Sequence, residues 1–274
     1  MGHDALAAPV LEALLFDVDG TLADTEEMHR LAFNAAFTGA GLDWYWDQAL
    51  YKDLLRITGG RERLRYFLER HAPSFRPTGD LDAFIAGLHR DKTRCYVQML
   101  SMGDVPLCPG VERLIREART QGLRLAIVTT TSPENVDSLL EHSFSGDVAG
   151  WFAIIAAGDA VPAKKPAPDI YHYALQRLGL PAERCLAIED SANGLLSARG
   201  AGVDVLITVN GYTRDQDFAG AAAVFDGLGE PDYPCHRLAG DLDPAGMVDI
   251  AFLRRVHAHA RTARRAAGGT EARG

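Results

Sequence analysis

The stretch LLFDVDGTLADT, residues 14–25, decides the fold. An apolar run leads directly into Asp17, and a second carboxylate follows two positions later at Asp19. Aspartate is a poor strand residue, and two carboxylates that lie close together repel each other. We therefore expect a buried strand that ends at a site where a cation or a reaction compensates for the two negative charges.

Five apolar runs are typical of buried parallel strands, which are covered on both faces of the sheet. They are LEALLF (11–16), LRLAIV (123–128), FAIIAA (152–157), RCLAIE (184–189) and VDVLITV (203–209). Helical periodicity separates the later runs, at 111–122, 132–143 and 167–179. Strands that alternate with helices indicate right-handed β–α–β units. The sequence therefore predicts an α/β protein with a doubly wound, Rossmann-like parallel sheet.

The segment 24–101 interrupts this alternation. It contains no convincing strand, but four stretches have the spacing of amphipathic helices: 26–41, 46–57, 60–71 and 81–100. Because this segment follows the first strand, it can lie over the end of that strand as a lid. We predict a helical cap domain over residues 24–101 and a core domain made of residues 1–23 and 102–274.

The C-terminal segment begins with a helical pattern and ends in small and charged residues. Six arginines follow residue 250, which raises the possibility of an anionic partner. A solvated, frayed end is the simpler interpretation, with residues 266–274 as a disordered tail. His257 and His259 are two positions apart and do not share a helical face, so we assign them no metal.

Composition narrows the class of protein. The 274 residues are 47% hydrophobic and 24% charged, which is typical of a globular protein, and a net charge of −9 argues against nucleic-acid binding. No segment reaches the ~18 apolar residues of a membrane span, and the N-terminus has no basic signal region. Cysteines 95, 108, 185 and 235 are widely spaced, which favours reduced thiols. We expect a cytoplasmic protein with no nucleic-acid or membrane partner.

Polar side chains follow four of the apolar runs. They are Asp17 and Asp19 after the first run, Thr129 after the second, Lys164 and Lys165 after the third, and Glu189 and Asp190 at the end of the fourth. Each has an ordinary explanation on its own, such as a turn, a helix cap or a surface charge. The carboxyl ends of parallel strands, however, meet at one edge of the sheet, where ligands bind. Together these residues therefore predict a site.

The residue types at this edge favour phosphoryl transfer. Several carboxylates in one place require a cation, and oxygen ligands beside a substrate phosphate suit Mg²⁺. Thr129 and Lys165 offer donors to phosphate oxygens. One aspartate can attack phosphorus, and the other can give and take protons.

The same residues carry a resemblance to a known family. DVDGTLADT, the first threonine of the TTT run in AIVTTT, the Lys-Pro pair of AKKPAPDIY and EDSANGLLSARGAG resemble the four motifs of the haloacid dehalogenase (HAD) superfamily. Their order and spacing agree over about residues 11–210. The resemblance implies an α/β core with a small helical cap, whose side chains choose the substrate.

The resemblance also implies a role for each motif residue. Asp17 corresponds to the nucleophile that becomes an aspartyl phosphate, and Asp19 corresponds to the general acid and base. Thr129 and Lys165 correspond to the residues that anchor the phosphate and the nucleophile. The implied ligands of Mg²⁺ are Asp17, Asp19 through its backbone carbonyl, Asp190, and Glu189 through water.

Within the predicted cap, the stretch ITGGRERL (57–64) indicates an anion site. Two glycines before a helix leave free N–H groups, and Arg61 and Arg63 add positive charge. A substrate with two phosphates would fit: one phosphate over Asp17 and the other held near Gly60 and Arg61. Glu26 lies close to the nucleophile motif and suits sugar hydroxyls.

A closer resemblance is to the CbbY-type phosphatases, carried by FDVDGTLADTEEMHR, YKDLLRITGGRER and VTTTSPENVDSLL. These enzymes remove the 1-phosphate from xylulose 1,5-bisphosphate, a side product that inhibits Rubisco in the Calvin–Benson cycle. The resemblance implies a small sugar phosphate as the binding partner. The implied substrate contacts are Glu26, His29, Tyr51, Arg56, Gly59, Gly60, Arg61, Lys92, Thr129, Thr130 and Lys165. Many members have a lysine where this chain has Arg61.

Two other functions stay open. A sugar phosphomutase similar to β-phosphoglucomutase shares the motifs, including Thr25 and His29, and also handles a bisphosphate. The TTT run and the YKDLLRITGGRER stretch favour the phosphatase. A non-catalytic HAD-fold binding protein is the other alternative, but it would be expected to lack a motif residue, and all of them are present. Because a lid must open freely, we expect a monomer.

Overall fold

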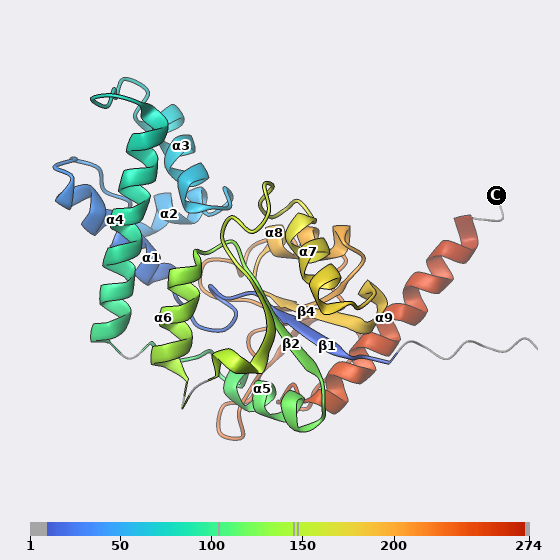
Figure 1. The fold of residues 1–274 in the computed structure, drawn as a ribbon. Coiled ribbons are helices and arrows are strands. Elements are labelled where there is room, and N and C mark those ends of the chain that lie inside the picture. The colour runs from blue at the N-terminus through green and yellow to red at the C-terminus, as the bar shows by residue number, and fades with distance from the viewer. Residues whose placement is uncertain (1–9, 104, 145, 147, 272–274) are drawn as a thin grey trace, which may run out of the picture.

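The computed structural model describes residues 10–271, apart from residues 104, 145 and 147. An α/β body carries a group of four helices at one end (Figure 1). Residues 1–9, which the sequence assigned to the core domain, lie outside the described residues.

Within the described residues, a seven-stranded sheet in the order β3-β2-β1-β4-β5-β6-β7 forms the centre of the body. Five strands coincide with the predicted apolar runs: β1 (Ala13–Phe16), β2 (Arg124–Val128), β3 (Phe152–Ala156), β4 (Cys185–Glu189) and β5 (Asp204–Thr208). All five are parallel, and β1 pairs with both β2 and β4. The prediction of a doubly wound parallel sheet is confirmed.

Two short strands at one edge of the sheet had no sequence signal. β6 (Ala223–Phe225) pairs parallel with β5, and β7 (Arg237–Ala239) pairs antiparallel with β6. Each has three residues, which is too short for an alternating pattern to be recognised. The edge strand β7 is exposed along its length.

Helices cover both faces of the sheet. One face packs against α5 (Val111–Thr120), α6 (Pro133–Ser143) and α9 (Ile250–Glu271), and the other against α7 (Asp169–Leu178) and α8 (Ala192–Gly200). Successive side chains in a strand point to opposite faces. Leu14 and Phe16 therefore join the core beside α5, while Leu15 joins the core beside α7. Short 3₁₀ helices at Ala149–Trp151 and Ala182–Arg184 lead into β3 and β4.

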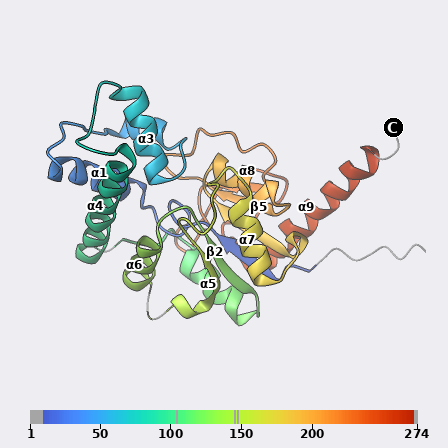
Figure 2. The same cartoon turned by 45° about the horizontal axis from the view of Figure 1, so that its top comes forward.

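The helices inserted after β1 are α1 (Glu26–Gly39), α2 (Gln48–Leu54), α3 (Gly60–His71) and α4 (Leu81–Met102). They surround an aromatic core of their own, which includes Phe33, Phe37 and Trp46. Tyr96 and Leu100 of α4, by contrast, belong to the main core of the body. Figures 1 and 2 both show the four helices grouped at one end of the body, and we call this group the cap. The domain boundaries at 24 and 101 stay a prediction.

The C-terminal helix corrects the expectation of a solvated end. α9 continues to Glu271, so residues 266–271 of the predicted disordered tail are helical, while 272–274 lie outside the described residues. Phe252, Leu253 and Val256 are buried against the sheet. These apolar positions follow the spacing of a helix face, which the surrounding arginines obscure in the sequence. Figures 1 and 2 show the far end of α9 leading away from the body.

A buried ion pair ties α9 to the sheet. Asp204, the first residue of β5, is 3% exposed, and its carboxylate pairs with Arg261 Nε at 2.7 Å and with Arg264 Nε at 2.8 Å. Arg261 is buried as well. A carboxylate at this depth is stable only with partners, because burial removes its hydration.

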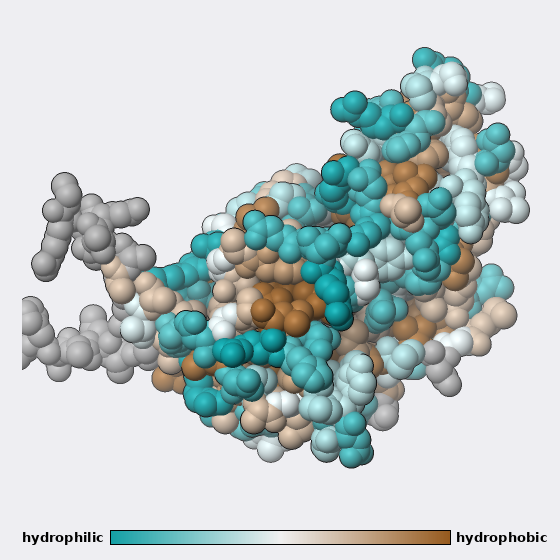
Figure 3. Space-filling model, turned by 180° about the vertical axis from the view of Figure 1, so that it is seen from behind, coloured by the Kyte–Doolittle hydropathy of each residue, from teal (hydrophilic) through white to brown (hydrophobic). Residues whose placement is uncertain are grey.

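No helix in the described part of the chain is both long and apolar enough to cross a membrane. Hydrophilic side chains cover most of the face seen in Figure 3, and a hydrophobic patch lies near the middle of that face.

We predict that Arg261→Met lowers the free energy of unfolding by about 3 kcal/mol, because it leaves Asp204 buried with one partner fewer. Arg254→Met is the matched control, since Arg254 is exposed on the same helix. Urea unfolding of both variants measures the difference. Equal stability of the two variants would show that the ion pair does not hold α9 in place.

Candidate active site

A cavity of about 420 Å³ lies between the cap and the carboxyl edge of the sheet. Twelve of the predicted site residues line it: Asp17, Asp19, Glu26, His29, Arg56, Gly59, Gly60, Lys92, Thr129, Thr130, Lys165 and Asp190. The structure thus brings the motif residues and most of the predicted cap residues to one place. Tyr51, Arg61 and Glu189 do not line this cavity.

The loop after β1 presents the two aspartates. It turns tightly, because the amides of Thr21 and Leu22 both donate to the carbonyl of Val18. Gly20 has a φ of +82°, and a Cβ there would lie 2.3 Å from Oδ2 of Asp190. Only glycine allows the loop to approach Asp190 this closely.

Lys165 joins three strands of the sheet at the floor of the cavity. Its Nζ donates to Asp17 Oδ1 at 2.7 Å, to the carbonyl of Val128 at 2.8 Å and to Glu189 Oε1 at 2.5 Å. Burial alone would lower the pKa of Lys165, but the carboxylates of Asp17 and Glu189 raise it above its usual value. The lysine is therefore charged, and it fixes the orientation of Asp17.

Three buried carboxylates form a cluster around one point. One oxygen each from Asp17, Glu189 and Asp190 lie within 4.8 Å of one another. Burial and the neighbouring carboxylate of Glu189 raise the pKa of Asp17 to about 8, although Lys165 opposes the shift. Burial, followed by Asp17 and Glu189, raises the pKa of Asp190 well above its usual value. Three ionised carboxylates in this buried place would carry more negative charge than Lys165 can balance, so without a further cation Asp17 and Asp190 tend to hold their protons.

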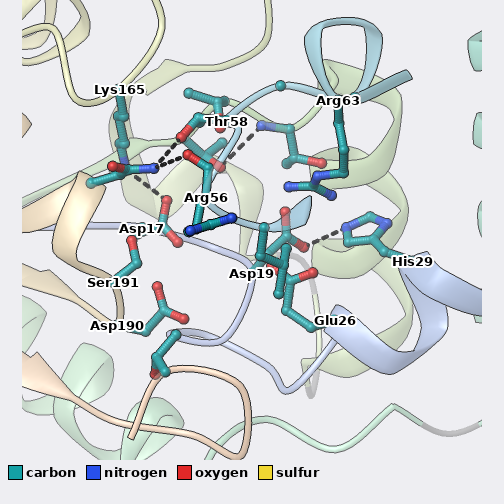
Figure 4. A pocket seen from close by; sticks show the side chains of 18 of the residues that line it. Asp17, Asp19, Glu26, His29, Arg56, Thr58, Arg63, Lys165, Asp190 and Ser191 are labelled. Carbon is teal, nitrogen blue, oxygen red and sulfur yellow. Dashed lines mark hydrogen bonds and ion pairs between the residues drawn. The ribbon is translucent and has the colours of Figure 1, made fainter. Parts of the chain in front are cut away.

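The cluster fits a hard divalent cation. Oε2 of Glu189 is buried and has no hydrogen-bond partner, so it is an oxygen that still needs a positive neighbour. Figure 4 shows Asp17 and Asp190 directed toward one space. Carboxylate oxygens of this kind suit Mg²⁺. The side chain of Asp19 is not part of the cluster, which leaves only its backbone carbonyl as the predicted ligand.

Asp19 is held apart by partners from the cap. Its Oδ1 accepts from the Thr25 hydroxyl at 2.6 Å and from His29 Nε2 at 2.8 Å. Lys92 Nζ donates to Nδ1 of His29 at 2.6 Å, so the proton of the imidazole lies on Nε2, facing Asp19. Burial would raise the pKa of Asp19, but His29 and Thr25 hold it below its usual range. Burial lowers the pKa of Lys92 to about 8.

The cap side of the cavity carries positive charge from α3. Nε of Arg63 donates to the carbonyls of Leu54 at 3.2 Å and Ile57 at 3.3 Å, which fix its side chain. Arg63 also donates to the hydroxyl of Tyr51 at 3.0 Å, and this hydroxyl donates to Glu26 Oε2 at 2.9 Å. Tyr51 is thus buried behind the cavity, where it positions Glu26 and Arg63.

The predicted glycine pair lies at the start of α3. Gly59 has a φ of +95°, and a Cβ at Gly60 would lie 2.4 Å from Nε2 of His89. His89 lines the cavity, and burial, with Lys92 and Arg61 nearby, lowers its pKa to about 3. His89 is therefore neutral near pH 7 and adds no charge beside the glycines.

Arg61 does not take the place that the sequence suggested. It is half exposed outside the cavity and pairs with Asp159, which also binds Lys164 at 2.6 Å. Residues two positions apart on a helix point about 200° apart, so Arg61 and Arg63 cannot both face the site. The sequence could not decide which of the two faces it, and the structure places Arg63 there.

Several cavity residues had no sequence signal. Arg63 was predicted as part of the anion site, but the sequence did not single out Thr58, His89, Thr131, Ser132, Asn135, Ser191 and Asn193. Asn193 of α8 donates to Thr58 Oγ1 at 2.9 Å and links the core to the cap. Small polar residues are common at helix starts, so their type alone did not mark them.

The fold and the site define a class of protein. Residues 11–202 match the model of the haloacid dehalogenase-like hydrolases, and the chain belongs to this family. It is a phosphatase-type enzyme, as its closely similar relatives indicate.

Proteins called CbbY are among these relatives. Protein CbbY of Rhodobacter capsulatus is 54% identical over 211 residues, which cover 77% of this chain and 91% of that protein. The crystal structure of CbbY from Rhodobacter sphaeroides with phosphate is 47% identical, with a TM-score of 0.75, and the match covers 80% and 95% of the two chains. A variant of the same protein was solved in complex with xylulose-(1,5)bisphosphate, at 46% identity and the same coverage and TM-score.

We predict that Mg²⁺ raises the thermal midpoint of the metal-free protein. A ligand at 100 times its Kd adds roughly 2.7 kcal/mol to the free energy of unfolding. Asp190→Asn should remove most of this shift, because it takes away one charged oxygen of the cluster. Asp159→Asn is the control, since Asp159 is exposed outside the cavity. The same Mg²⁺ shift in both variants would contradict a metal site at the cluster.

Proposed function

We propose that this enzyme removes one phosphate from a small sugar bisphosphate, with Mg²⁺ as its cofactor and xylulose 1,5-bisphosphate as its substrate. The observation that carries the proposal is the distribution of charged groups within one cavity. A carboxylate cluster with Lys165 lies at the floor, and Arg56, Arg63 and Lys92 lie on the cap side. A molecule with a phosphate at each end can bridge the two regions.

The chemistry follows from the two aspartates. Lys165 holds Oδ1 of Asp17, so Oδ2 is the oxygen that attacks phosphorus as the bond to the sugar oxygen breaks. The pKa of Asp19 is lowered, so its carboxylate is ionised, and the proton for the leaving sugar oxygen passes through Asp19 from the hydrogen-bonded His29–Lys92 pair. Water then loses a proton to Asp19 and attacks the aspartyl phosphate, which releases phosphate and restores Asp17. The proton taken from water restores the His29–Lys92 pair. When bound, the metal offsets the negative charge of the carboxylates and the phosphate.

Neighbouring groups support these two steps. Thr129 lines the cavity at the end of β2, beside β1, and its hydroxyl can donate to a phosphate oxygen. His29 and Lys92 control the protonation of Asp19, because the three side chains form one hydrogen-bonded chain. The cap closes the cavity from above, which keeps bulk water from the first step.

We assign the second phosphate to the cap. Arg63 is fixed by two backbone carbonyls. Gly59 and Gly60 form the start of α3, where backbone N–H groups attract anions. Arg56 lies in the same wall. Because Arg61 pairs with Asp159 outside the cavity, Arg63 replaces it in this proposal. Glu26 is placed to accept from a sugar hydroxyl.

The choice of xylulose 1,5-bisphosphate rests on the relatives. A CbbY variant that is 46% identical to this chain was solved with that compound. By this likeness the enzyme would act in the Calvin–Benson cycle, where the compound inhibits Rubisco. Cytoplasmic location and a monomeric state stay predictions. A sugar phosphomutase is the alternative outcome of the same site, in which a sugar hydroxyl rather than water receives the phosphoryl group.

The first test is a phosphate-release assay with xylulose 1,5-bisphosphate, ribulose 1,5-bisphosphate, glucose 1-phosphate and p-nitrophenyl phosphate. We expect the highest kcat/KM for xylulose 1,5-bisphosphate, because a similar protein was solved with that compound and because, unlike the two monophosphates, it has a second phosphate for the cap. Asp17→Asn should lower kcat by at least about 10⁴-fold, since the nucleophile is lost. An isomerised sugar phosphate without free phosphate would indicate the mutase instead.

The second test compares two arginines on α3. We expect Arg63→Ala to raise the KM for xylulose 1,5-bisphosphate by roughly 30-fold or more, because a charge-assisted pair with phosphate contributes about 2 kcal/mol. The KM for p-nitrophenyl phosphate, which has one phosphate, should change much less. Arg61→Ala serves as the comparison, because it removes the same charge outside the cavity. A larger effect of Arg61→Ala than of Arg63→Ala would overturn the assignment.

A further inference from the structure

Two polar residues at the start of α6 line the cavity, and no proposed step uses them. Ser132 and Asn135 both line the cavity, on the core side, directly after the threonines that follow β2. Asn135 is 3% exposed, and its Oδ1 has no hydrogen-bond partner. The hydroxyl of Ser132 is buried and also has none. Buried polar atoms without partners are rare and costly, and in residues that line a cavity they point to a bound molecule as the partner.

The position of Ser132 strengthens this argument. Ser132 is the N-cap of α6, where a serine hydroxyl ordinarily accepts a hydrogen bond from an amide of the first turn. Here the side chain makes no capping bond. The first turn instead closes through backbone, with the amide of Asn135 donating to the carbonyl of Ser132 at 3.1 Å. The hydroxyl therefore has no hydrogen-bond partner within the described part of the protein.

The orientation of Asn135 determines the chemistry of its partner. Its Nδ2 donates to the hydroxyl of Thr131 at 2.9 Å, which leaves Oδ1 as the free atom. An amide oxygen only accepts hydrogen bonds. A phosphate that carries no proton has nothing to donate, so it does not satisfy this atom. A sugar hydroxyl does, because it can donate to Asn135 and accept from the hydroxyl of Ser132.

We propose that Asn135 and Ser132 are specificity residues that recognise a hydroxyl group on the carbon chain between the two phosphates of the substrate. This inference rests on the proposed function. It adds a core-side contact to the cap contacts and makes the cavity selective for polyhydroxylated chains. A molecule with two phosphates but no hydroxyls would leave Oδ1 of Asn135 unpaired, and the desolvation of that atom would weaken binding.

The test uses Asn135→Leu, which keeps a similar volume but removes the acceptor. Its kcat/KM is measured with xylulose 1,5-bisphosphate and with pentane-1,5-diol bisphosphate, which has the same two phosphates and no hydroxyls. We expect the fall to be about tenfold larger for the sugar than for the diol ester, the size of one lost hydrogen bond to a buried acceptor. Ser132→Ala should show a smaller difference of the same sign, about threefold.

Ser143→Ala is the matched control. Ser143 lies at the other end of α6, and its hydroxyl is also buried without a partner, but it does not line the cavity. It should leave both rates unchanged. If Asn135→Leu lowers the kcat/KM values for the sugar and the diol ester equally, or leaves both unchanged, Asn135 does not recognise a hydroxyl. In that case only this inference fails. If the wild-type enzyme hydrolyses p-nitrophenyl phosphate but neither bisphosphate, the proposed function fails, and this inference fails with it.

Discussion

The contact of Lys165 with Asp17 and Glu189 is the interaction on which the site depends. Three carboxylates are buried at one point, and one ammonium group cannot neutralise them. Isolated charges at this depth would cost several kcal/mol each. The lysine orients the cluster, and the remaining negative charge creates the demand for a metal. The same imbalance makes the position attractive to a cation and hostile to a second anion unless the cation is present.

The order of the strands brings these groups together. β1 lies between β2 and β4, so the residues that follow these three strands are neighbours at the carboxyl edge. Asp17, Thr129 and Asp190 reach the cavity from adjacent strands, although more than 170 positions separate the first from the last. Lys165 arrives from the loop beyond β3 and spans the gap to β4. The sheet therefore sets the geometry, and the loops only supply the side chains.

Sequence reasoning succeeded where one physical rule dominates. Long apolar runs located β1 to β5, and the parallel arrangement then placed Asp17, Thr129 and Asp190 at one edge. It failed where the direction of a side chain on a helix, or the packing of segments far apart in the sequence, decides the position of a residue. The choice between Arg61 and Arg63 depends on the helix phase of α3, and the burial of α9 depends on partners such as Asp204, which lies far away in the sequence. Asn135 was missed because an asparagine at a helix start is unremarkable until its surroundings are known.

The cap divides into a fixed and an exchangeable part. The groups that hold Asp19, His29 on α1 and Lys92 on α4, are on helices whose ends pack into the main core. The segment between these two helices contains the residues assigned to the second phosphate, namely Arg56, Gly59, Gly60 and Arg63. Substitutions of cavity-facing residues in the α2–α3 segment can therefore change which molecules enter while His29 and Lys92 keep their contacts with Asp19. This modularity offers a physical reason why one α/β scaffold could serve many phosphate esters.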